Sequence, residues 1–405
     1  MTDFSTEYFT MNETQAVEYA KEKLDYFHSD AELTCKEIGD GNLNYVFRIV
    51  DQKNKDSIIL KQAGPVARIS DEFKVSPDRN RIESDILKIQ YDYVPEYTPK
   101  TYQYDPVMNC FAMEDLSEYE IMRSALIKHQ TFPQFAEHIT TFMAKTLLLT
   151  SDVAMNHKDK KALVKSFINP ELCEITEDLV YTEPFYNCER NEVFPATRSF
   201  IETEIWGDKQ LQLETAKLKF EFMTNAQSLI HGDLHTGSVF IKQDSTKVID
   251  PEFAFYGPAG YDIGNVVANL IFAYANGQAT ITDAEEREQF TNYIITTIRD
   301  VIDLFKEKFK KLWQETDKEF VANYDGFQTY YLNSILQDTA AVVGLELTRR
   351  IIGLAKVADI TSIEQEEARK TAEINCLTVA KQFILNRETF KTGDNFVFQV
   401  KKAFD

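Results

Sequence analysis

Two neighbouring segments constrain this chain more than any other feature: S-L-I-H-G-D-L-H-T-G-S at residues 228–238 and K-V-I-D-P-E at residues 247–252. Short apolar runs at residues 239–241 and 247–249 flank a polar Q-D-S-T turn and predict a small β-hairpin. Because a hairpin brings its ends together, we expect Asp233 and Asp250 on one rim. Phosphoryl transfer needs such a pair, since one carboxylate accepts the proton of the attacking hydroxyl and another holds magnesium against the nucleotide phosphates.

Two other interpretations of the first segment stay open. His231, Asp233 and His235 alternate, so in an extended segment they share one face and could be the metal ligands of a hydrolase. The other histidines lie far upstream, at spacings that suggest no further ligands: His28, His129, His138 and His157. The second alternative is a purely structural turn with hydrogen-bonded Asp and His side chains. Neither alternative accounts for the rest of the chain.

Composition indicates a globular protein with two lobes or domains. The chain has 405 residues, more than one ordinary domain, with 43% hydrophobic and 27% charged residues. A formal net charge of −21 argues against nucleic-acid or anionic-membrane partners, because both are bound through clusters of Lys and Arg. We therefore expect any nucleotide to be bound by a local positive site within an acidic molecule.

Cysteine usage and the N-terminus predict a cytoplasmic protein. The five cysteines are widely spread without a C-x-x-C pair, which favours reduced thiols. The first residues, M-T-D-F-S-T-E-Y, lack the basic and apolar regions of a signal peptide. The longest apolar stretch, residues 266–275, is too short to span a bilayer.

Hydrophobic periodicity predicts an α+β chain whose character changes at residues 113–116. The first part favours antiparallel strands at residues 35–51, 57–61 and 102–113, with a helix capped by Asn12 and another helix at residues 79–91. The second part favours long helices within residues 121–150, 210–229, 262–276 and 336–354, the third of them capped by Asp262. We therefore predict a β-rich lobe at residues 1–113 and a mainly helical lobe at residues 114–405, with a ligand site in the cleft of such a bilobal fold.

The first part also carries residues suited to nucleotide phosphates. In I-G-D-G-N-L-N, Gly39 and Gly41 let backbone N–H groups approach phosphates, while Asn44 replaces the third glycine of a protein-kinase loop. A G-x-G in a hairpin can also be a simple turn. Lys61 could reach the phosphates or be an exposed strand lysine, and Glu83 could pair with it or be a solvated helical acid.

The order of these features is more specific than any single one. A glycine loop, a strand lysine, a helical glutamate, a lobe junction, a catalytic aspartate and a metal-binding aspartate follow one another as a kinase-like fold requires. The combination predicts a kinase-like fold with a phosphotransfer centre.

In these motifs and their order, the chain resembles the methylthioribose kinase family, which is related in fold to the aminoglycoside and choline phosphotransferases. The resemblance extends from about residue 37 to beyond residue 350, and the segments that carry it are G-D-G-N-L-N at 39–44, H-G-D-L-H-T-G-S at 231–238, D-P-E-F-A-F-Y-G-P-A-G-Y-D-I-G at 250–264 and the pair Arg349 and Arg350. It implies a bilobal protein-kinase-like fold, ATP and Mg²⁺ as cofactors, and a homodimer. It also implies phosphorylation of the 1-hydroxyl of 5-methylthioribose in methionine salvage.

The same resemblance implies roles for individual residues. Asp233 would be the catalytic base, and Asp250 with Glu252 would hold magnesium. The segment 113–116 would be a hinge that binds adenine through backbone groups of Glu114 and Leu116.

The chain departs from the broader phosphotransferase pattern at two positions. Ser238 stands where an asparagine supplies an oxygen to the second magnesium, and Glu252 follows Pro251 where protein kinases have D-F-G. A carboxylate oxygen suits magnesium better than a serine hydroxyl does. We infer that metal binding shifts from position 238 to position 252. Pro251 should also stiffen this segment.

The twin arginine is the expected substrate-binding feature. Adjacent helical residues point about 100° apart, so at least one of Arg349 and Arg350 should enter the site. Glu346 offers the alternative of a simple surface ion pair with Arg350.

Two alternative functions stay open. Another small-molecule kinase of this fold would act on an aminoglycoside, choline or homoserine, although the twin arginine disfavours a cationic substrate. A nucleotide-binding regulator without catalysis is disfavoured because Lys61, Asp233 and Asp250 are all present.

Overall fold

A computed structural model describes residues 3–38, 44–64 and 75–404 of the chain. Gly39 and Gly41 of the predicted phosphate loop lie outside the described residues. The chain forms two compact units: Met1–Tyr119 with Ile249–Ala254, and Glu120–Val248 with Phe255–Asp405. The predicted lobe boundary at residues 113–114 and the hinge at 113–116 stay predictions.

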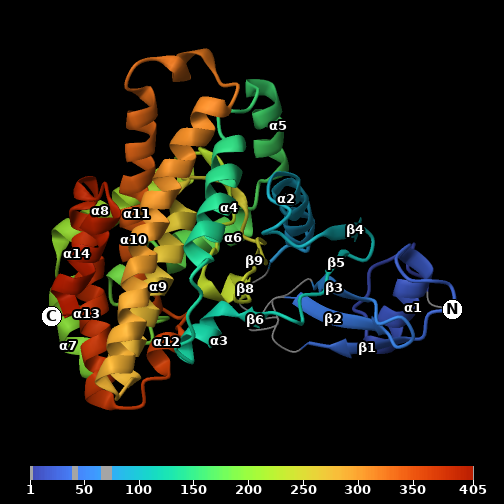
Figure 1. The fold of residues 1–405 in the computed structure, drawn as a ribbon, viewed down its shortest axis with the longest axis horizontal. Coiled ribbons are helices and arrows are strands. Elements are labelled where there is room, and N and C mark those ends of the chain that lie inside the picture. The colour runs from blue at the N-terminus through green and yellow to red at the C-terminus, as the bar shows by residue number, and fades with distance from the viewer. Residues whose placement is uncertain (1–2, 39–43, 65–74, 405) are drawn as a thin grey trace. The chain divides into compact units, whose positions relative to one another are not determined.

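The first unit contains a five-stranded antiparallel sheet in the order β1-β2-β3-β5-β4 (Figure 1). Its strands are β1 Leu33–Glu37, β2 Asn44–Asp51, β3 Ser57–Ala63, β4 Thr101–Asp105 and β5 Cys110–Glu114. The alternating and apolar runs of the sequence predicted this antiparallel sheet. In β3, Lys61 lies opposite Val46 of β2 and Phe111 of β5, so it is in the middle of the sheet.

Two helices pack on opposite faces of this sheet. Successive strand residues point to opposite faces, and on one face Ile58 and Leu60 join a buried cluster with residues of α1 (Glu13–Lys23). On the other face, Ile59 packs in a cluster with Phe111 and with Leu87 of α2 (Arg79–Tyr93). Lys61 is two residues beyond Ile59, which places it on the α2 face.

The second unit is mainly helical, as predicted. Its helices are α3 Met122–Ile127, α4 Phe135–Leu149, α5 His157–Ser166, α6 Pro170–Leu179, α7 Arg198–Ile201, α8 Lys209–Thr224, α9 Gly260–Thr280, α10 Ala284–Glu315, α11 Phe327–Ile352, α12 Ala358–Thr361, α13 Glu366–Leu385 and α14 Gly393–Phe404. The long helices form a bundle in which α11 packs on α9 and α13, and α10 packs on α4 and α9 (Figure 1). The predicted α+β class is therefore confirmed.

Short strands of the second unit frame the H-G-D-L-H segment. β8 (Val239–Ile241) and β9 (Thr246–Val248) form the predicted hairpin, with Val239 opposite Val248. β6 (Glu120–Ile121) extends it beside β8, while β7 (Ser228–Ile230) pairs with β10 (Phe255–Gly257). The segment thus connects two strands that have different partners.

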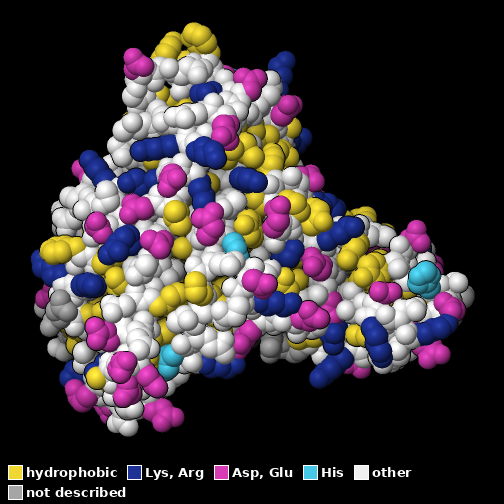
Figure 2. Space-filling model, in the orientation of Figure 1, with side chains coloured by type: hydrophobic (Ala, Val, Ile, Leu, Met, Phe, Trp, Pro, Cys, Tyr) yellow, Lys and Arg dark blue, Asp and Glu magenta, His cyan; other side chains and the backbone are white. Residues whose placement is uncertain are grey.

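Charged side chains of both signs are interspersed on the face of the molecule shown in Figure 2. The apolar stretch at residues 266–275 lies in α9, where every residue from Gly260 to Gly277 is buried. Among the described residues, the structure contains no helix with the length and apolarity needed to cross a membrane.

α9 and α11 approach each other closely at Gly264. A Cβ atom at this position would lie 2.6 Å from Cβ of Val342 and 2.8 Å from the carbonyl oxygen of Thr339. Real Cβ contacts are longer than this, and a helix carbonyl cannot move aside independently. The packing of the bundle core therefore requires glycine here.

We predict that Gly264→Ala lowers the free energy of unfolding by about 1 to 3 kcal/mol through overpacking. Urea denaturation followed by far-ultraviolet circular dichroism measures the change. Gln278→Ala at an exposed position of the same helix is the control, because a smaller side chain there creates no overlap with a neighbouring helix. Equal effects of the two substitutions would contradict the close approach of the two helices.

Candidate active site

The backbone around Asp233 is fixed by a buried carboxylate. Asp262, in the first turn of α9, accepts the backbone N–H groups of His231 at 2.7 Å and Gly232 at 3.0 Å. Gly232 has φ of 83°, a left-handed conformation that favours glycine. The expectation that Asp262 caps its own helix is wrong, because Ala259 is the N-cap residue and the Asp262 side chain binds the loop instead.

His235 and Ser238 hold Asp233 from the other side. The backbone N–H of Ser238 donates to Nδ1 of His235 at 3.1 Å, so in the neutral ring the proton is on Nε2, which lies 3.3 Å from Oδ2 of Asp233. Burial lowers the pKa of His235, and the Asp233 carboxylate only partly opposes this. The hydroxyl of Ser238 donates to the carbonyl of Asp233 at 3.0 Å. Ser238 therefore stabilises the loop itself.

The metal-hydrolase interpretation of His231, Asp233 and His235 is not supported by these contacts. Nδ1 of His231 accepts the backbone N–H of Asp233 at 3.3 Å, and Nδ1 of His235 is bound as described above. Within the described part of the chain, a different group brings three ligand atoms together, in the first unit.

Both arginines of the twin pair lie beside Asp233. The Nη2 atoms of Arg349 and Arg350 are each 3.7 Å from Oδ1 of Asp233. Glu346 contacts the Nε atoms of the same two guanidinium groups, at 3.3 Å for Arg349 and 2.7 Å for Arg350. Glu346 is 1% exposed, so the interpretation of its pair with Arg350 as a surface pair is wrong.

The carboxylates of Asp233 and Glu346 are kept ionised by their positively charged and hydrogen-bonding neighbours. Burial alone would raise the pKa of Asp233, but His235, Arg349 and Arg350 outweigh it and hold the pKa well below its usual range. The pKa of Glu346 is likewise lowered, because the two arginines outweigh its burial. Oδ1 of Asp233 and Nη2 of Arg350 are buried without a hydrogen-bond partner. Such atoms suit a ligand with hydroxyl groups, which can both donate and accept.

Lys61 is the centre of a second charged cluster, in the first unit. Its Nζ donates to Oε1 of Glu83 at 2.8 Å and also to Oδ1 of Asp250. Lys61 is buried, so the alternatives of an exposed strand lysine and a solvated Glu83 are wrong. Burial alone would lower the pKa of Lys61, but the carboxylates around it raise the pKa instead.

Three carboxylates of this cluster are suited to a metal ion. Glu83, Asp250 and Glu252 each offer an oxygen atom, and the three atoms lie within 4.8 Å of one another. Burial and the neighbouring Asp250 raise the pKa of Glu252 to about 7, and burial raises that of Glu83 to about 8 against the effect of Lys61. Hard oxygen ligands crowded in this way fit Mg²⁺, whose charge would relieve their repulsion.

Further contacts fix the geometry of this carboxylate cluster. Nδ2 of Asn44 donates to Oε2 of Glu252 at 3.0 Å, and Nε of Arg79 lies 3.5 Å from the same oxygen. Asp250 has φ of 67°, a left-handed conformation that is unusual for a residue followed by proline. Backbone strain of this kind concentrates at functional sites.

Glu114 and Leu116, the residues predicted to bind adenine, have other backbone partners in the structure. The backbone N–H of Glu114 donates to the carbonyl of Lys100 at 2.8 Å, and the carbonyl of Leu116 accepts the N–H of Tyr119 at 2.9 Å. The adenine-binding role of Glu114 and Leu116 stays a prediction. The structure places Asp233 in the second unit and Asp250 in the first, and their position on one rim also stays a prediction.

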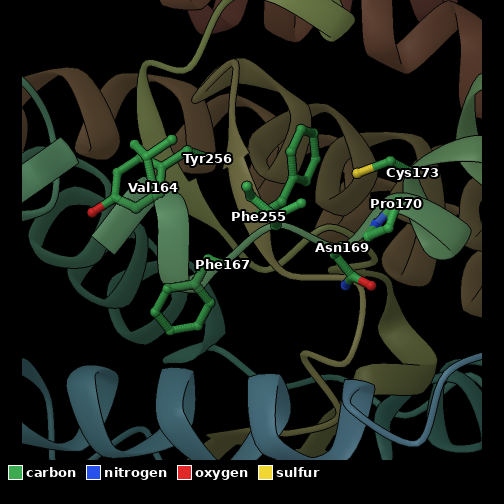
Figure 3. Close-up of a pocket in the computed structure, with 8 residues that line it drawn as sticks. Val164, Phe167, Asn169, Pro170, Cys173, Phe255 and Tyr256 are labelled. Atoms are coloured by element: carbon green, nitrogen blue, oxygen red, sulfur yellow. The ribbon is translucent and has the colours of Figure 1, made fainter. Parts of the chain in front are cut away.

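A surface pocket of the second unit is lined by other residues (Figure 3). Its volume is about 160 Å³ and its lining is mainly apolar, including Val164, Phe167, Pro170, Cys173, Phe255 and Tyr256. It contains none of the predicted site residues. Burial raises the pKa of Cys173 to about 12, which makes this thiol a poor nucleophile.

Similarity to known proteins covers nearly the whole chain. A model of the phosphotransferase enzyme family matches residues 202–293. The methylthioribose kinase of Geobacillus sp. (strain WCH70) is 43% identical over 388 residues, covering 96% of this chain and 94% of that protein. The methylthioribose kinase of Bacillus pumilus (strain SAFR-032) is 40% identical over 398 residues, covering 98% of each.

Among solved structures, choline kinase from Cryptosporidium parvum Iowa II is similar with a TM-score of 0.50 and 14% identity, covering 95% of this chain and 99% of that one. This similarity concerns the fold alone, and it confirms the predicted kinase-like fold. Because the sequence relatives align along almost their entire length at 40% identity or more, the chain belongs to the methylthioribose kinase family.

Proposed function

We propose that this protein transfers the γ-phosphoryl group of ATP to the 1-hydroxyl of 5-methylthioribose and so produces 5-methylthioribose 1-phosphate in methionine salvage. Membership of the methylthioribose kinase family supports the kinase activity and a small-molecule substrate. The observation that carries the proposal is the half-buried Asp233 beside two arginines, with buried polar atoms that lack hydrogen-bond partners.

Asp233 acts on the acceptor hydroxyl. Its carboxylate accepts the hydroxyl hydrogen and orients the oxygen for attack on the γ-phosphorus. The bond from the sugar oxygen to phosphorus forms, the bond from phosphorus to the leaving ADP oxygen breaks, and the hydroxyl proton passes to Asp233. Its neighbours hold Asp233 ionised, so its carboxylate is available to accept and orient the hydroxyl hydrogen. Arg349 and Arg350 stabilise the negative charge of the transferring group.

Asp250 and Glu252 are the proposed Mg²⁺ ligands. When bound, Mg²⁺ neutralises the nucleotide phosphates and the charge that develops during transfer. Ser238 uses its hydroxyl within the loop, which supports the shift of metal binding to Glu252. Lys61, oriented by Glu83, is the proposed phosphate contact. Gly39, Gly41, Asn44, Glu114 and Leu116 remain the proposed nucleotide contacts.

A homodimer is also proposed, from the family resemblance, and so is a cytoplasmic location, from the cysteine usage and the N-terminal sequence. Choline, homoserine and aminoglycosides are less suited substrates, because the two guanidinium groups already balance the two carboxylates of the site and leave no excess negative charge for a cationic acceptor.

We predict ADP formation with methylthioribose in the presence of Mg²⁺, and little or none with ribose, choline or an aminoglycoside. A coupled spectrophotometric assay with these acceptors side by side measures it. Asp233→Asn is the matched control, since it keeps the shape of the side chain but removes the proton acceptor. Its turnover should fall by roughly 10² to 10⁴, while ATP binding persists. Turnover with choline and none with methylthioribose would refute the proposed substrate.

We predict that Glu252→Gln raises the Mg²⁺ concentration needed for half-maximal turnover much more than Ser238→Ala does. The reason is that an anionic oxygen ligand is lost at position 252, whereas only a hydroxyl within the loop is lost at position 238. Turnover titrated with Mg²⁺ at fixed total ATP gives both values. A larger effect at Ser238 would place the metal ligand there.

We predict that Arg349→Ala or Arg350→Ala, or both, lowers turnover about a hundredfold to a thousandfold, which is the effect of losing a preorganised charge at the transferring group. Circular dichroism and ATP affinity should be unchanged in the variants used. Arg369→Ala is the control, because Arg369 forms a comparable ion pair with the buried Glu373 on α13. Near-normal turnover of both single variants would show that the twin arginine is structural.

A further inference from the structure

Glu346 is a buried carboxylate that contacts both arginines of the twin pair. Its two carboxylate oxygens contact the Nε atoms of Arg350 and Arg349, at 2.7 Å and 3.3 Å. Each guanidinium therefore has its Nε side on Glu346 and an Nη2 atom 3.7 Å from Oδ1 of Asp233. One buried carboxylate thus orients both arginines toward the catalytic aspartate.

These four side chains form an electrically neutral group. Arg349 and Arg350 supply two positive charges, and Asp233 and Glu346 supply two negative charges, since both carboxylates have lowered pKa values. Without Glu346 the group would carry one net positive charge.

The neighbouring charged side chains have partners of their own. Nε of Arg123 lies 3.5 Å from Oδ2 of the buried Asp359, so this neighbouring pair is balanced as well. His235 is neutral, because its pKa is lowered and its Nδ1 accepts a backbone N–H. Asp262, another buried carboxylate near Asp233, is held by the backbone N–H groups of His231 and Gly232. Glu346 is therefore the carboxylate that, together with Asp233, directly opposes the two arginines.

We infer that Glu346 is a charge-balancing and positioning residue that fits the acceptor site to an uncharged sugar and lets the anionic sugar 1-phosphate leave. The inference rests on the proposed function and deepens it. A sugar phosphate carries between one and two negative charges near neutral pH. Two arginines opposed only by Asp233 would bind such a product tightly, whereas the neutral group holds a sugar through its hydroxyls and does not attract the product electrostatically.

The test is Glu346→Gln, which keeps the size of the side chain and removes its charge. Isothermal titration calorimetry measures the Kd of ribose 1-phosphate, of inorganic phosphate and of neutral ribose, for the wild-type protein and the variant. We expect the variant to bind both anions more tightly by on the order of tenfold to a hundredfold, the effect of one unit charge a few ångströms away at an intermediate dielectric constant. Neutral ribose should bind no more tightly than before.

Glu373→Gln is the matched control. Glu373 is also 1% exposed, and it accepts from Nε of an arginine four residues away on its helix at 3.0 Å, but it contacts none of the four charged side chains. Its loss should leave the anion affinities unchanged. Equal anion binding by wild type and Glu346→Gln would overturn the inference, and so would an equal gain in Glu373→Gln or a parallel gain for ribose.

The wild-type protein provides a test that does not depend on how the variant folds. Wild type should bind ribose 1-phosphate no more tightly than ribose, and clearly tighter binding of the anion would overturn the role of Glu346. These affinities need no turnover. If wild type fails to phosphorylate methylthioribose, the proposed function fails while the binding comparison still decides the charge-balancing role.

Discussion

Buried charge is stable in a protein only where it is paired, and both units of this structure are organised around that requirement. The cluster in the second unit pairs two carboxylates with two guanidinium groups and is neutral. The cluster in the first unit sets three carboxylates, Glu83, Asp250 and Glu252, against Lys61 and Arg79, so it has one negative charge in excess when all are ionised. Burial, and after it the neighbouring carboxylates, raise the pKa values of Glu83 and Glu252. An anionic cluster suits a divalent cation, and a neutral cluster suits a sugar. The difference in net charge between the two clusters therefore matches the proposed Mg²⁺ and sugar sites.

The first cluster depends on the register of the sheet. Because side chains alternate along β3, Lys61 shares the face of Ile59 and meets Glu83 of α2, while Ile58 and Leu60 fill the core under α1. A shift of one residue would bury a lysine in that apolar core and remove Glu83 from its reach. The apolar residues that fix the register of β3 thus also position the charge of Lys61.

Local signals in the sequence predicted local structure well. The β8–β9 hairpin follows from a polar turn flanked by two apolar runs, and the N-cap Asn12 is confirmed because its reciprocal bonds involve only Gln15, three residues away. Long-range placement could not be predicted in the same way. The position of Asp262 next to a helix start suggests a cap, yet its partners are backbone groups 30 and 31 residues earlier. Similarly, the spacing of Glu346 and Arg350 is that of a surface pair, and only the packing of α11 against α9 and α13 reveals that the pair is buried.

The contacts of Ser238 and Glu252 suit these two residues to different tasks. Ser238 is short enough to bond back to the carbonyl of Asp233 within its own loop, while its N–H fixes the tautomer of His235. It thereby holds the Asp233 carboxylate from within the second unit. Glu252 is long enough to reach the cluster of Glu83 and Asp250, and Asn44 and Arg79 keep it there against the repulsion of its neighbours. The proposed shift of an oxygen ligand from position 238 to position 252 would therefore leave Ser238 to orient Asp233, and would give metal binding to a residue that is anchored in the same unit as Lys61.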